Sequence, residues 1–326
     1  MKKSIYVLIM LLFITVSNSF GQKEIIDFLN AGVEDANSLG QAYLEPYGEM
    51  LGVNLNGGWY NSAKVHKVLG FDVMFSASYT TVPSAGKSFD ANEIGLKNVS
   101  PSGDGITPTM AGKPSQEQSF YFNEDPTQTD ILRIKGSDLN FFVSPMLQAA
   151  VGLPFHTEVI GRFMPTVDMM DYGKVSLWGL GVKHSIKDYI PFVKRVPMLQ
   201  LSVLGAYTNF SSNLGVEFGD DSGDLEIGAN AYSARLLAGL NFPVICFYAG
   251  MGYGSTSTNF DVLGSFSGIP GEGETIVENP ISLAYSTDGF DFNVGMRLRL
   301  AIFAIYVDYT VGDYSVITAG VGLNFR

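Results

Sequence analysis

Few side chains in this sequence of 326 residues could act as an acid, a base or a metal ligand. There are three histidines, and the only cysteine is Cys246. His156 and Glu158 lie two residues apart, so an extended strand would place both on one face. An imidazole and a carboxylate held together in this way could form a catalytic acid–base pair, or they could belong to a hydrogen-bond network that packs an interior.

The rest of the sequence favours the hydrogen-bond network. It contains no G-x-S-x-G nucleophile motif, no H-E-x-x-H zinc motif and no C-x-x-C pair. The acidic stretch 219–224 lacks the ligand spacing of a calcium-binding loop, and a solvated acidic surface explains it better than loose binding of divalent ions. We therefore expect no catalytic residue, no metal and no cofactor, and we do not expect an enzyme.

Charged residues also recur at alternate positions in stretches whose other face is apolar. The expected inward-facing set is Asp72, His156, Glu158, Arg162, Lys183, Arg235, Arg297, Arg299 and Asp308. Opposite charges on facing strands can pair across an interior. The set predicts either the packing of a narrow interior or a constriction that attracts anions.

These charges need elements that hold them on one side, and the sequence supplies β-strands. Phe71, Val73 and Phe75 alternate with Asp72 and Met74, which is the period of two residues typical of a strand. The stretches with this pattern are 50–60, 71–79, 139–151, 155–163, 175–183, 198–208, 232–240, 244–256, 292–300, 302–311 and 314–325. Because bacterial single-chain membrane barrels have an even number of strands, we expect an antiparallel transmembrane β-barrel of about 12 to 14 strands over residues 47–326.

The last stretch resembles the C-terminal signal by which outer-membrane β-barrels of Gram-negative bacteria are recognised for insertion. The matching residues are Thr318, Gly320, Leu323 and Phe325, and Arg326 departs from the pattern because most such chains end on the aromatic residue. The resemblance implies insertion into the outer membrane by the barrel-assembly machinery.

The start of the chain predicts export. Lys2 and Lys3 precede an apolar run over 5–16, and small residues then lead to an expected cleavage of a signal peptide, residues 1–21, before Gln22. About a dozen apolar residues are too few for a spanning helix. Loss of the two lysines takes the formal net charge from -12 to -14, which argues against nucleic acid as a partner. With one cysteine, the exported chain has no internal disulfide.

The composition agrees with strands that carry apolar and aromatic residues by alternation. Apolar residues make up 46% of the chain and aromatic residues 13%, yet beyond Val16 no apolar stretch approaches the about 20 residues of a membrane helix. A soluble β-sandwich could share these percentages, so the alternation and the turn pattern carry the assignment.

Residues 22–46 have a different pattern, and we expect two short helices between 23 and 44. Their apolar residues at helical spacing are Ile25, Ile26, Phe28, Leu29, Leu39 and Tyr43. This segment could be a plug that enters the barrel or a loosely attached periplasmic tail.

Short and long connections alternate along the expected strands. The long ones are a polar insertion at about 83–137, which could contain a hairpin, and the links 209–230 and 257–289. Acidic residues gather in these three regions, and the last two contain no lysine or arginine. Since outer-membrane barrels have short periplasmic turns and long extracellular loops, we expect the acidic regions outside the cell.

Two further segments suggest a family. Trp178 to Lys183 with the following residues to Pro197, and the run Gly57-Gly-Trp-Tyr-Asn61, resemble barrels related to the long-chain fatty acid transporter (FadL) and the secretion component PorV, as an uncharacterised branch of that group. The resemblance implies a barrel with an N-terminal plug. It implies no functional residue, because members of the group divide between uptake of hydrophobic substrates and accessory roles in secretion.

Two functions therefore remain from the sequence. The first is the passage of small hydrophobic or amphipathic molecules across the outer membrane, with a hydrophobic ligand and the membrane lipid as partners. The alternative is a structural or secretion-accessory barrel whose acidic outer loops bind a partner protein.

Overall fold

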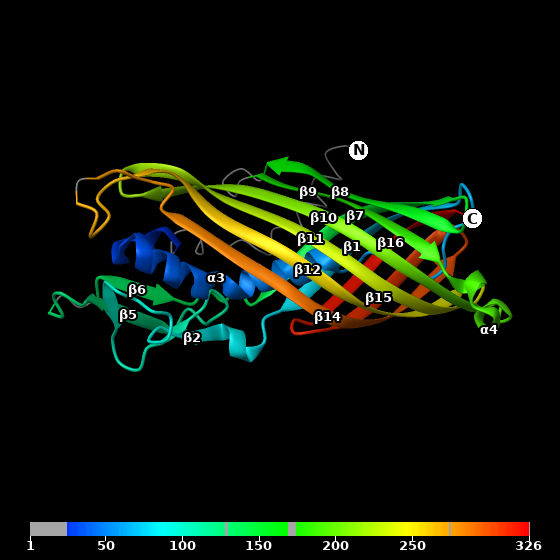
Figure 1. Cartoon of the computed structure of the whole chain (residues 1–326), viewed down its shortest axis with the longest axis horizontal. Coiled ribbons are helices and arrows are strands. Elements are labelled where there is room, and N and C mark those ends of the chain that lie inside the picture. The colour runs from blue at the N-terminus through cyan, green and yellow to red at the C-terminus, as the bar shows by residue number, and fades with distance from the viewer. Residues whose placement is uncertain (1–24, 128–129, 169–173, 274, 326) are drawn as a thin grey trace.

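The computed structural model describes residues 25–127, 130–168, 174–273 and 275–325 (Figure 1). In these residues ten antiparallel strands form a closed barrel, because β1 pairs with both β7 and β16, and β11 pairs with β12. The barrel strands are β1 (Phe71–Thr81), β7 (Phe141–Leu153), β8 (Thr157–Asp168), β9 (Lys174–Ser185), β10 (Leu199–Phe218), β11 (Asp221–Asn241), β12 (Ile245–Phe266), β14 (Ile281–Leu300), β15 (Phe303–Val311) and β16 (Val316–Phe325). The short β13 (Val277–Glu278) pairs with the end of β12 outside the ring.

The last strand closes the ring with the alternation that the sequence predicts. Thr318 and Gly320 point inward, where Thr318 Oγ1 lies 3.0 Å from Ser78 Oγ of β1. Ile317 and Val321 point outward and are exposed. The aromatic ring of Phe325 stacks on that of Phe71 with 4.8 Å between centroids, so the end of the chain is fixed to the first strand.

The expected count of 12 to 14 strands is wrong, because the stretch 50–60 is not a strand. Residues up to Asn56 belong to helix α3 (Val33–Asn56), which continues through Pro46 across the expected boundary between plug and barrel. Leu51 and Leu55 lie four residues apart, so they satisfy a helical spacing as well as an alternation of two. Of the two short helices expected over 23–44, the first is present as helical residues 25–27 and the 3₁₀ turn η2 (Phe28–Ala31). The second begins after Gly32 but is this one long helix.

Four neighbouring strands are far longer than the rest. β10, β11, β12 and β14 have 20 to 22 residues, whereas β15 and β16 have nine and ten. The expected loop 209–230 is therefore mostly strand, and only residues 219–220 lie between β10 and β11. The expected loop 257–289 is also mostly strand. The long strands extend beyond one end of the barrel (Figure 1).

The two faces of these long strands exchange polarity part-way along. In β11, Leu236 and Leu240 point outward while Arg235 points inward. Nearer the start of the same strand, Glu226 points outward while Ile227 is buried inside. An apolar outer face therefore belongs to the barrel part, and an apolar inner face to the extension.

Aromatic residues mark the level at which the exchange occurs. Tyr207, Tyr232, Tyr253 and Phe290 are the outward residues at this level on the four long strands. Their rings form a row, with centroid distances of 5.0 Å for Tyr207 and Tyr232 and 5.1 Å for Tyr253 and Phe290. Trp178 of β9 continues the row at 5.4 Å from Tyr207.

Between this aromatic row and the opposite end, the barrel surface is apolar on all sides. We call this surface the apolar belt. Its exposed residues include Phe71, Val73, Leu147, Val182, Leu236, Leu240, Met251, Val294, Ile305, Val307, Val321 and Leu323. At the end of the belt farthest from the row, which we call the turn end, the chain makes the tight connections 154–156, 242–244 and 301–302 and carries the short helices η5 (Lys187–Tyr189) and α4 (Pro191–Lys194).

At the other end the long strands contribute to a distal domain. It consists of α3, η2, the extended parts of β10, β11, β12 and β14, and the insertion 82–140 with η3 (Ser84–Lys87), β2 (Ser88–Asp90), β3 (Val99–Pro101), β4 (Ile106–Pro108), β5 (Glu117–Phe122) and β6 (Leu132–Lys135). The expected hairpin in the insertion is present as the pair β5 and β6. Figure 1 shows α3, in blue, between the extended strands and the insertion.

Helix α3 packs closely on β14 because it presents glycines to that strand. A Cβ atom added at Gly48 would lie 2.8 Å from Cγ of Tyr285, and one added at Gly52 would lie 2.5 Å from Oγ1 of Thr287. Burial raises the pKa of the nearby Tyr47 to about 12. Among the described residues, no helix is long and apolar enough to cross a membrane.

Candidate functional site in the barrel lumen

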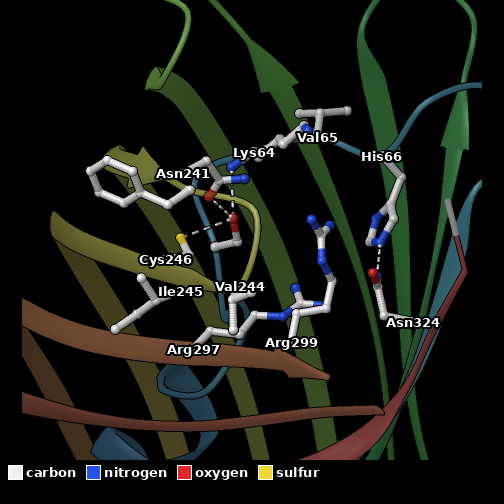
Figure 2. A pocket seen from close by; sticks show the side chains of 12 residues that line it. Lys64, Val65, His66, Asn241, Val244, Ile245, Cys246, Arg297, Arg299 and Asn324 are labelled. Carbon is white, nitrogen blue, oxygen red and sulfur yellow. Dashed lines mark hydrogen bonds between the residues drawn. The ribbon is translucent and has the colours of Figure 1, made fainter. Parts of the chain in front are cut away.

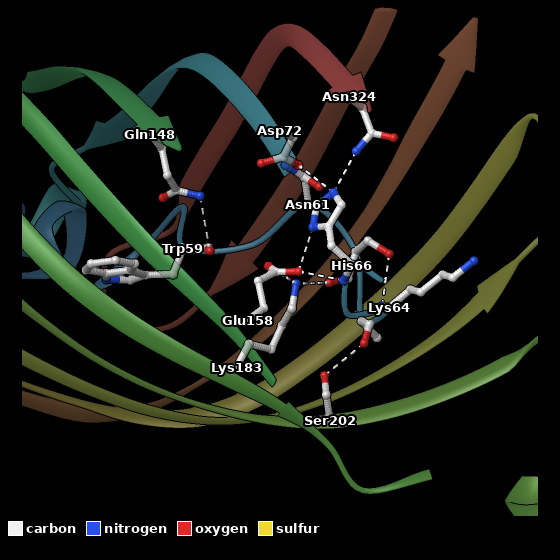
Figure 3. A network of polar contacts seen from close by, with 12 residues as sticks. Trp59, Asn61, Lys64, His66, Asp72, Gln148, Glu158, Lys183, Ser202 and Asn324 are labelled. Atoms are coloured by element: carbon white, nitrogen blue, oxygen red, sulfur yellow. Dashed lines mark hydrogen bonds and ion pairs between the residues drawn. The ribbon is translucent and has the colours of Figure 1, made fainter. Parts of the chain in front are cut away.

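The chain leaves α3 at the distal end and passes through the barrel as an extended segment, residues 57–66, before it turns into β1. We call this segment the lumen segment. Trp59, Tyr60, Asn61, Ser62 and Ala63 are all buried. Figure 3 shows Trp59, Asn61 and His66 inside the barrel, with charged side chains of several strands around them. The lumen segment therefore occupies the interior that a solute would have to cross.

The Trp59 side chain packs between an arginine on one side and two glycines of β9 on the other. The guanidinium carbon of Arg162 lies 3.6 Å from the ring centroid, which is a cation–π contact. On β9, Cβ atoms added at Gly179 and Gly181 would lie 3.0 Å and 3.1 Å from the indole ring. The glycines of the Trp178-Gly-Leu-Gly-Val-Lys183 run thus provide the surface on which Trp59 packs.

Arg162 also fixes the end of α3. Its Nη1 donates to the carbonyl oxygen of Leu55 at 3.2 Å, and its Nη2 donates to that of Gly57 at 2.8 Å. The last carbonyls of a helix lack partners within the helix and carry partial negative charge, so a buried guanidinium satisfies them well. Arg162 therefore joins the helix end, the lumen segment and the barrel wall.

Hydrogen bonds to residues of the barrel strands also hold Tyr60 of the lumen segment in place. The Tyr60 hydroxyl donates to Oδ1 of Asn293 at 3.2 Å, and Asn293 Nδ2 donates to Oδ1 of Asp308 at 2.9 Å. Tyr248 donates to the other oxygen of Asp308 at 3.0 Å, and its ring meets that of Tyr60 edge to face at 5.7 Å. Gly250 leaves the space that the Tyr60 hydroxyl fills.

Near the distal domain, two charged side chains of neighbouring parts of the barrel form an ion pair. Arg235 Nη2 lies 2.7 Å from Oδ2 of Asp291, and a second contact joins Nη1 to Oδ1, so the pair is bidentate. The same Nη2 donates to the carbonyl oxygen of Asn56 at 3.3 Å. Asp291 is a partner that the sequence reasoning missed.

Toward the turn end, His66 is held by carboxylates and an amide. Glu158 Oε2 accepts from the backbone N–H of His66 at 2.9 Å and lies 2.6 Å from its Nδ1. Lys183 Nζ lies 2.8 Å from Oε1 of the same carboxylate. The His66 Nε2 lies 2.7 Å from Nδ2 of Asn324 (Figure 3). His66 is thus the histidine of the network, although its place before β1 gave no sequence signal.

Most of the charged residues expected inside do lie there. Asp72, Glu158, Arg162, Lys183, Arg235, Arg297 and Asp308 are buried. Arg299 is partly exposed and lies at the mouth of the turn end, where its Nη2 donates to the carbonyl oxygen of Pro243 at 2.9 Å.

The expectation for His156 is wrong. Phe155 and His156 adopt positive φ angles of 63° and 55° to form the turn, so His156 leaves the alternation of β8. Its side chain is exposed and lies 3.7 Å from Asp188. It cannot pair with Glu158 inside the barrel.

With this geometry in view, the sequence can be compared with known proteins. It matches the family described as "Family of unknown function (DUF6588)" over residues 1–325. The chain belongs to this family. No curated protein matches its sequence.

Solved structures with a related outline are outer-membrane proteins of low sequence identity. The translocator domain of the autotransporter NalP from Neisseria meningitidis is 10% identical, with 80% of this chain and 90% of that chain covered and a TM-score of 0.36. The outer membrane protease OmpT from Escherichia coli is 9% identical, with 79% and 96% covered and a TM-score of 0.35. The toluene transporter TodX from P. putida is 9% identical, with 87% and 76% covered and a TM-score of 0.26.

In this member of DUF6588, the residues expected to form a plug lie elsewhere. Ile25, Ile26, Phe28, Leu29, Leu39 and Tyr43 are buried in the core of the distal domain, with apolar residues of β11, β12 and β14. Neither a lumen plug nor a periplasmic tail describes them. The reason is that the inner face of the extended strands is apolar, whereas the inner face of the barrel is polar, so an apolar helix packs on the extension.

The pockets at the two ends of the lumen segment are small. One, at the turn end, has a volume of ≈ 40 Å³, and one beside the end of α3 has ≈ 50 Å³. Each has room for a few water molecules. Within the described residues, no group of three or more histidine, cysteine or acidic side chains is placed to hold a metal ion. The arrangement is suited to holding the lumen segment in place.

Proposed function

We propose that this protein spans the outer membrane with its barrel and that the lumen segment keeps the barrel closed. The apolar belt carries the proposal, because a band of apolar residues around a barrel next to a row of aromatic residues is what a bilayer and its interface require. Strands β1, β15 and β16, with 11, nine and ten residues, have the length of about 9 to 11 residues that crosses a bilayer.

The exchange of polarity supports the same placement. Beyond the aromatic row, the outer face of the extended strands carries residues such as Asp224, Glu226 and Asn230, which water solvates. The distal domain therefore lies in water beside the membrane, and it lies outside the cell if the short connections of the turn end face the periplasm.

An arginine substitution can test where the membrane ends. Leu236 and Asp224 both point outward on β11, on opposite sides of Tyr232. We expect Leu236→Arg to destabilise the folded barrel in lipid by about 2 to 4 kcal/mol, because the guanidinium would enter the apolar part of the bilayer, and Asp224→Arg to have little effect. Unfolding by urea in lipid vesicles measures both values. Equal effects would place the bilayer elsewhere on the strand.

For its role, we propose that the barrel anchors the distal domain, which binds a partner protein of positive charge. The reasons are the filled lumen and the many carboxylates on the domain. Arg162 and Glu158 fix the two ends of the lumen segment, and Arg235 fixes the last residue of α3 directly before it. Passage through the barrel therefore requires breaking buried contacts. The extended strands present Glu217, Asp224, Glu226, Asp261 and Asp288 outward, without lysine or arginine between them. Such a surface attracts basic partners and speeds their association.

Gentle extraction in detergent tests this role. We expect the full chain to co-purify with a partner in fixed ratio, and the double change Asp224→Asn with Glu226→Gln to reduce the recovery. Glu117→Gln is the control, because Glu117 forms ion pairs with Arg133 and Lys135 and leaves that part of the surface nearly neutral. Recovery of a lone barrel in every extraction would count against partner binding.

One observation favours the other function, the passage of small hydrophobic molecules. The ladder between β7 and β8 ends at Leu147 and Phe163, although both strands continue. In the same register the next residues to bond would be Pro145 and Pro165, and neither has an N–H to donate. Among the described residues no ladder joins the two strands beyond this point, which leaves an opening in the pairing of the wall. Met164, the first inward residue of β8 beyond the ladder, packs against the core of the distal domain.

In this alternative function, apolar molecules enter through this opening from the outer leaflet of the membrane and reach the distal domain. A purified barrel that carries bound lipid or another apolar molecule, identified by mass spectrometry, would favour passage over partner binding. Closing the opening with a disulfide should then reduce that binding. The substitutions Met146→Cys and Met164→Cys suit this test, because in the same register these two inward residues face each other one position beyond the ladder.

A further inference from the structure

The turn end of the lumen holds a pocket that the role proposed above does not use. It lies between the last residues of the lumen segment, the connection 242–244, the end of β14 and the end of β16. Figure 2 shows Lys64, His66, Arg297 and Arg299 around this pocket, together with Asn241 and Asn324. Its volume is ≈ 40 Å³. It opens toward the side from which the lumen segment leaves the barrel.

The pocket has more positive than negative charge. Lys64, Arg297 and Arg299 line it, and no acidic residue does. Two buried carboxylates, Asp72 and Glu158, lie close to cations of the network. Asp72 Oδ2 is 3.7 Å from Nη1 of Arg297 and 3.7 Å from Nε2 of His66, and Glu158 is bound by Lys183 and His66. Lys67 and Lys187, on the neighbouring connection and on η5, add further positive charge at this end.

The cations of the pocket keep hydrogen-bonding capacity. In the described chain, Lys64 Nζ has no hydrogen-bond acceptor and no carboxylate within contact distance, and Arg299 donates from one nitrogen to the Pro243 carbonyl. Arg297 donates to Oδ1 of Asn61. Ser62 Oγ lies 3.4 Å from Oδ1 of Asn241, so the amide group of Asn241 faces the same space with its N–H groups. Donor groups of Lys64, Arg299 and Asn241 thus line a space that no carboxylate lines.

We propose that this pocket binds an oxyanion, a carboxylate or a phosphate group, which reaches it from the turn end. Guanidinium groups recognise the planar or tetrahedral oxygens of such anions through paired hydrogen bonds, and a lysine adds a point charge. The pocket volume of ≈ 40 Å³ is of the size of one such group once its water has been released. The site therefore takes an anionic head group, carried either by a lipid of the inner leaflet or by a soluble molecule.

The test uses the full chain, reconstituted in phosphatidylcholine vesicles, with inorganic phosphate and acetate as probes. Calorimetric titration of the probes should give saturable binding that weakens with salt. The double change Lys64→Gln with Arg299→Gln should lower the affinity for phosphate by about tenfold or more, because two charged donors are lost. Neither residue pairs with a carboxylate, so the barrel should still fold, which its shift on heating in electrophoresis reports.

Lys194→Gln is the matched control. Lys194 lies at the same end on α4, outside the pocket, and its side chain is exposed. We expect its loss to leave the affinity unchanged. Equal phosphate binding by the wild type and the double variant, or no saturable binding by the wild type, overturns the proposal.

A second arm identifies the source of the anion. When phosphatidylglycerol is included in the vesicles, a lipid head group that occupies the pocket should weaken phosphate binding by the wild type. An unchanged affinity would assign the pocket to a soluble anion. This result is independent of partner binding by the distal domain, which lies at the opposite end of the barrel.

Discussion

Replacement of both Trp59 and Tyr60 by alanine should turn a closed barrel into a conducting one. The two aromatic side chains are buried in the lumen, between Arg162 and the glycines of β9 on one side and Tyr248 on the other. Their removal leaves space that polar side chains line, and water fills polar cavities of sufficient size. In a planar lipid bilayer we expect the wild type to show no resolvable current steps, and the double variant to show steps for small ions.

Trp178→Ala is the matched control for this experiment. Trp178 neighbours Gly179 on the same strand, but its ring points outward to the aromatic row, so the lumen should stay closed. Deletion of residues 23–44 is a second comparison. It removes part of the distal core and leaves the lumen segment, so we expect no steady current from it. Large steady currents in the wild type would show that the lumen segment does not close the barrel.

The sequence predicted the barrel, where each strand keeps the same alternation of outward apolar and inward polar residues. Between the aromatic row and the turn end, apolar side chains face lipid and polar ones face the interior. Phe75 with Ser76, or Leu236 with Arg235, then shows the two faces directly in neighbouring residues. The buried charges followed from the same rule, because a lone charge among apolar residues on alternate positions has to point inward.

The sequence did not predict the distal domain, because the two faces of a strand exchange polarity within single strands. Apolar residues face outward in the barrel part of such a strand and inward in its extension. Leu225 and Ile227 alternate with Asp224 and Glu226 as regularly as any pair in the barrel, but the polar members face outward. The charges of this stretch predict a loop. The continuing period of two was the signal that could have identified it as a strand in water.

The lumen segment was missed for another reason. Its contacts join residues far apart in the sequence, such as Trp59 with Arg162 and Gly179. The two runs that suggested a family, around Trp59 and around Gly179, pack on each other. Nothing in the spacing within either run shows this, because the partner of each is set by the closure of the barrel.

The change Asp35→Ala should unfold the distal domain while the barrel remains. Asp35 lies in the first turn of α3 and has no exposed surface. Its Oδ1 accepts from the backbone N–H of Lys97 at 2.8 Å, and its Oδ2 accepts from those of Asn98 at 2.8 Å and Val99 at 2.9 Å. This carboxylate holds the insertion against the helix.

Alanine at that position leaves three backbone donors without a partner where little water reaches them. At about 1 to 3 kcal/mol for each buried donor, the three donors together cost about 3 to 9 kcal/mol, which is a large part of the stability of a small domain. We expect trypsin to cut the insertion of the variant at Lys97 and Arg133, while the heat-dependent shift of the barrel in electrophoresis is retained.

Glu34→Ala separates this effect from a general loss of charge. Glu34 precedes Asp35 on the same helix turn and forms an ion pair with Lys97, but the side chains are 61% and 64% exposed. An exposed pair of this kind contributes about 0 to 1 kcal/mol, so the insertion should stay resistant to trypsin. If both variants resist equally, the three hydrogen bonds to Asp35 do not hold the domain together. If both lose the barrel as well, the distal domain and the barrel unfold as one unit, and the lumen segment that joins them is the connection that makes them do so.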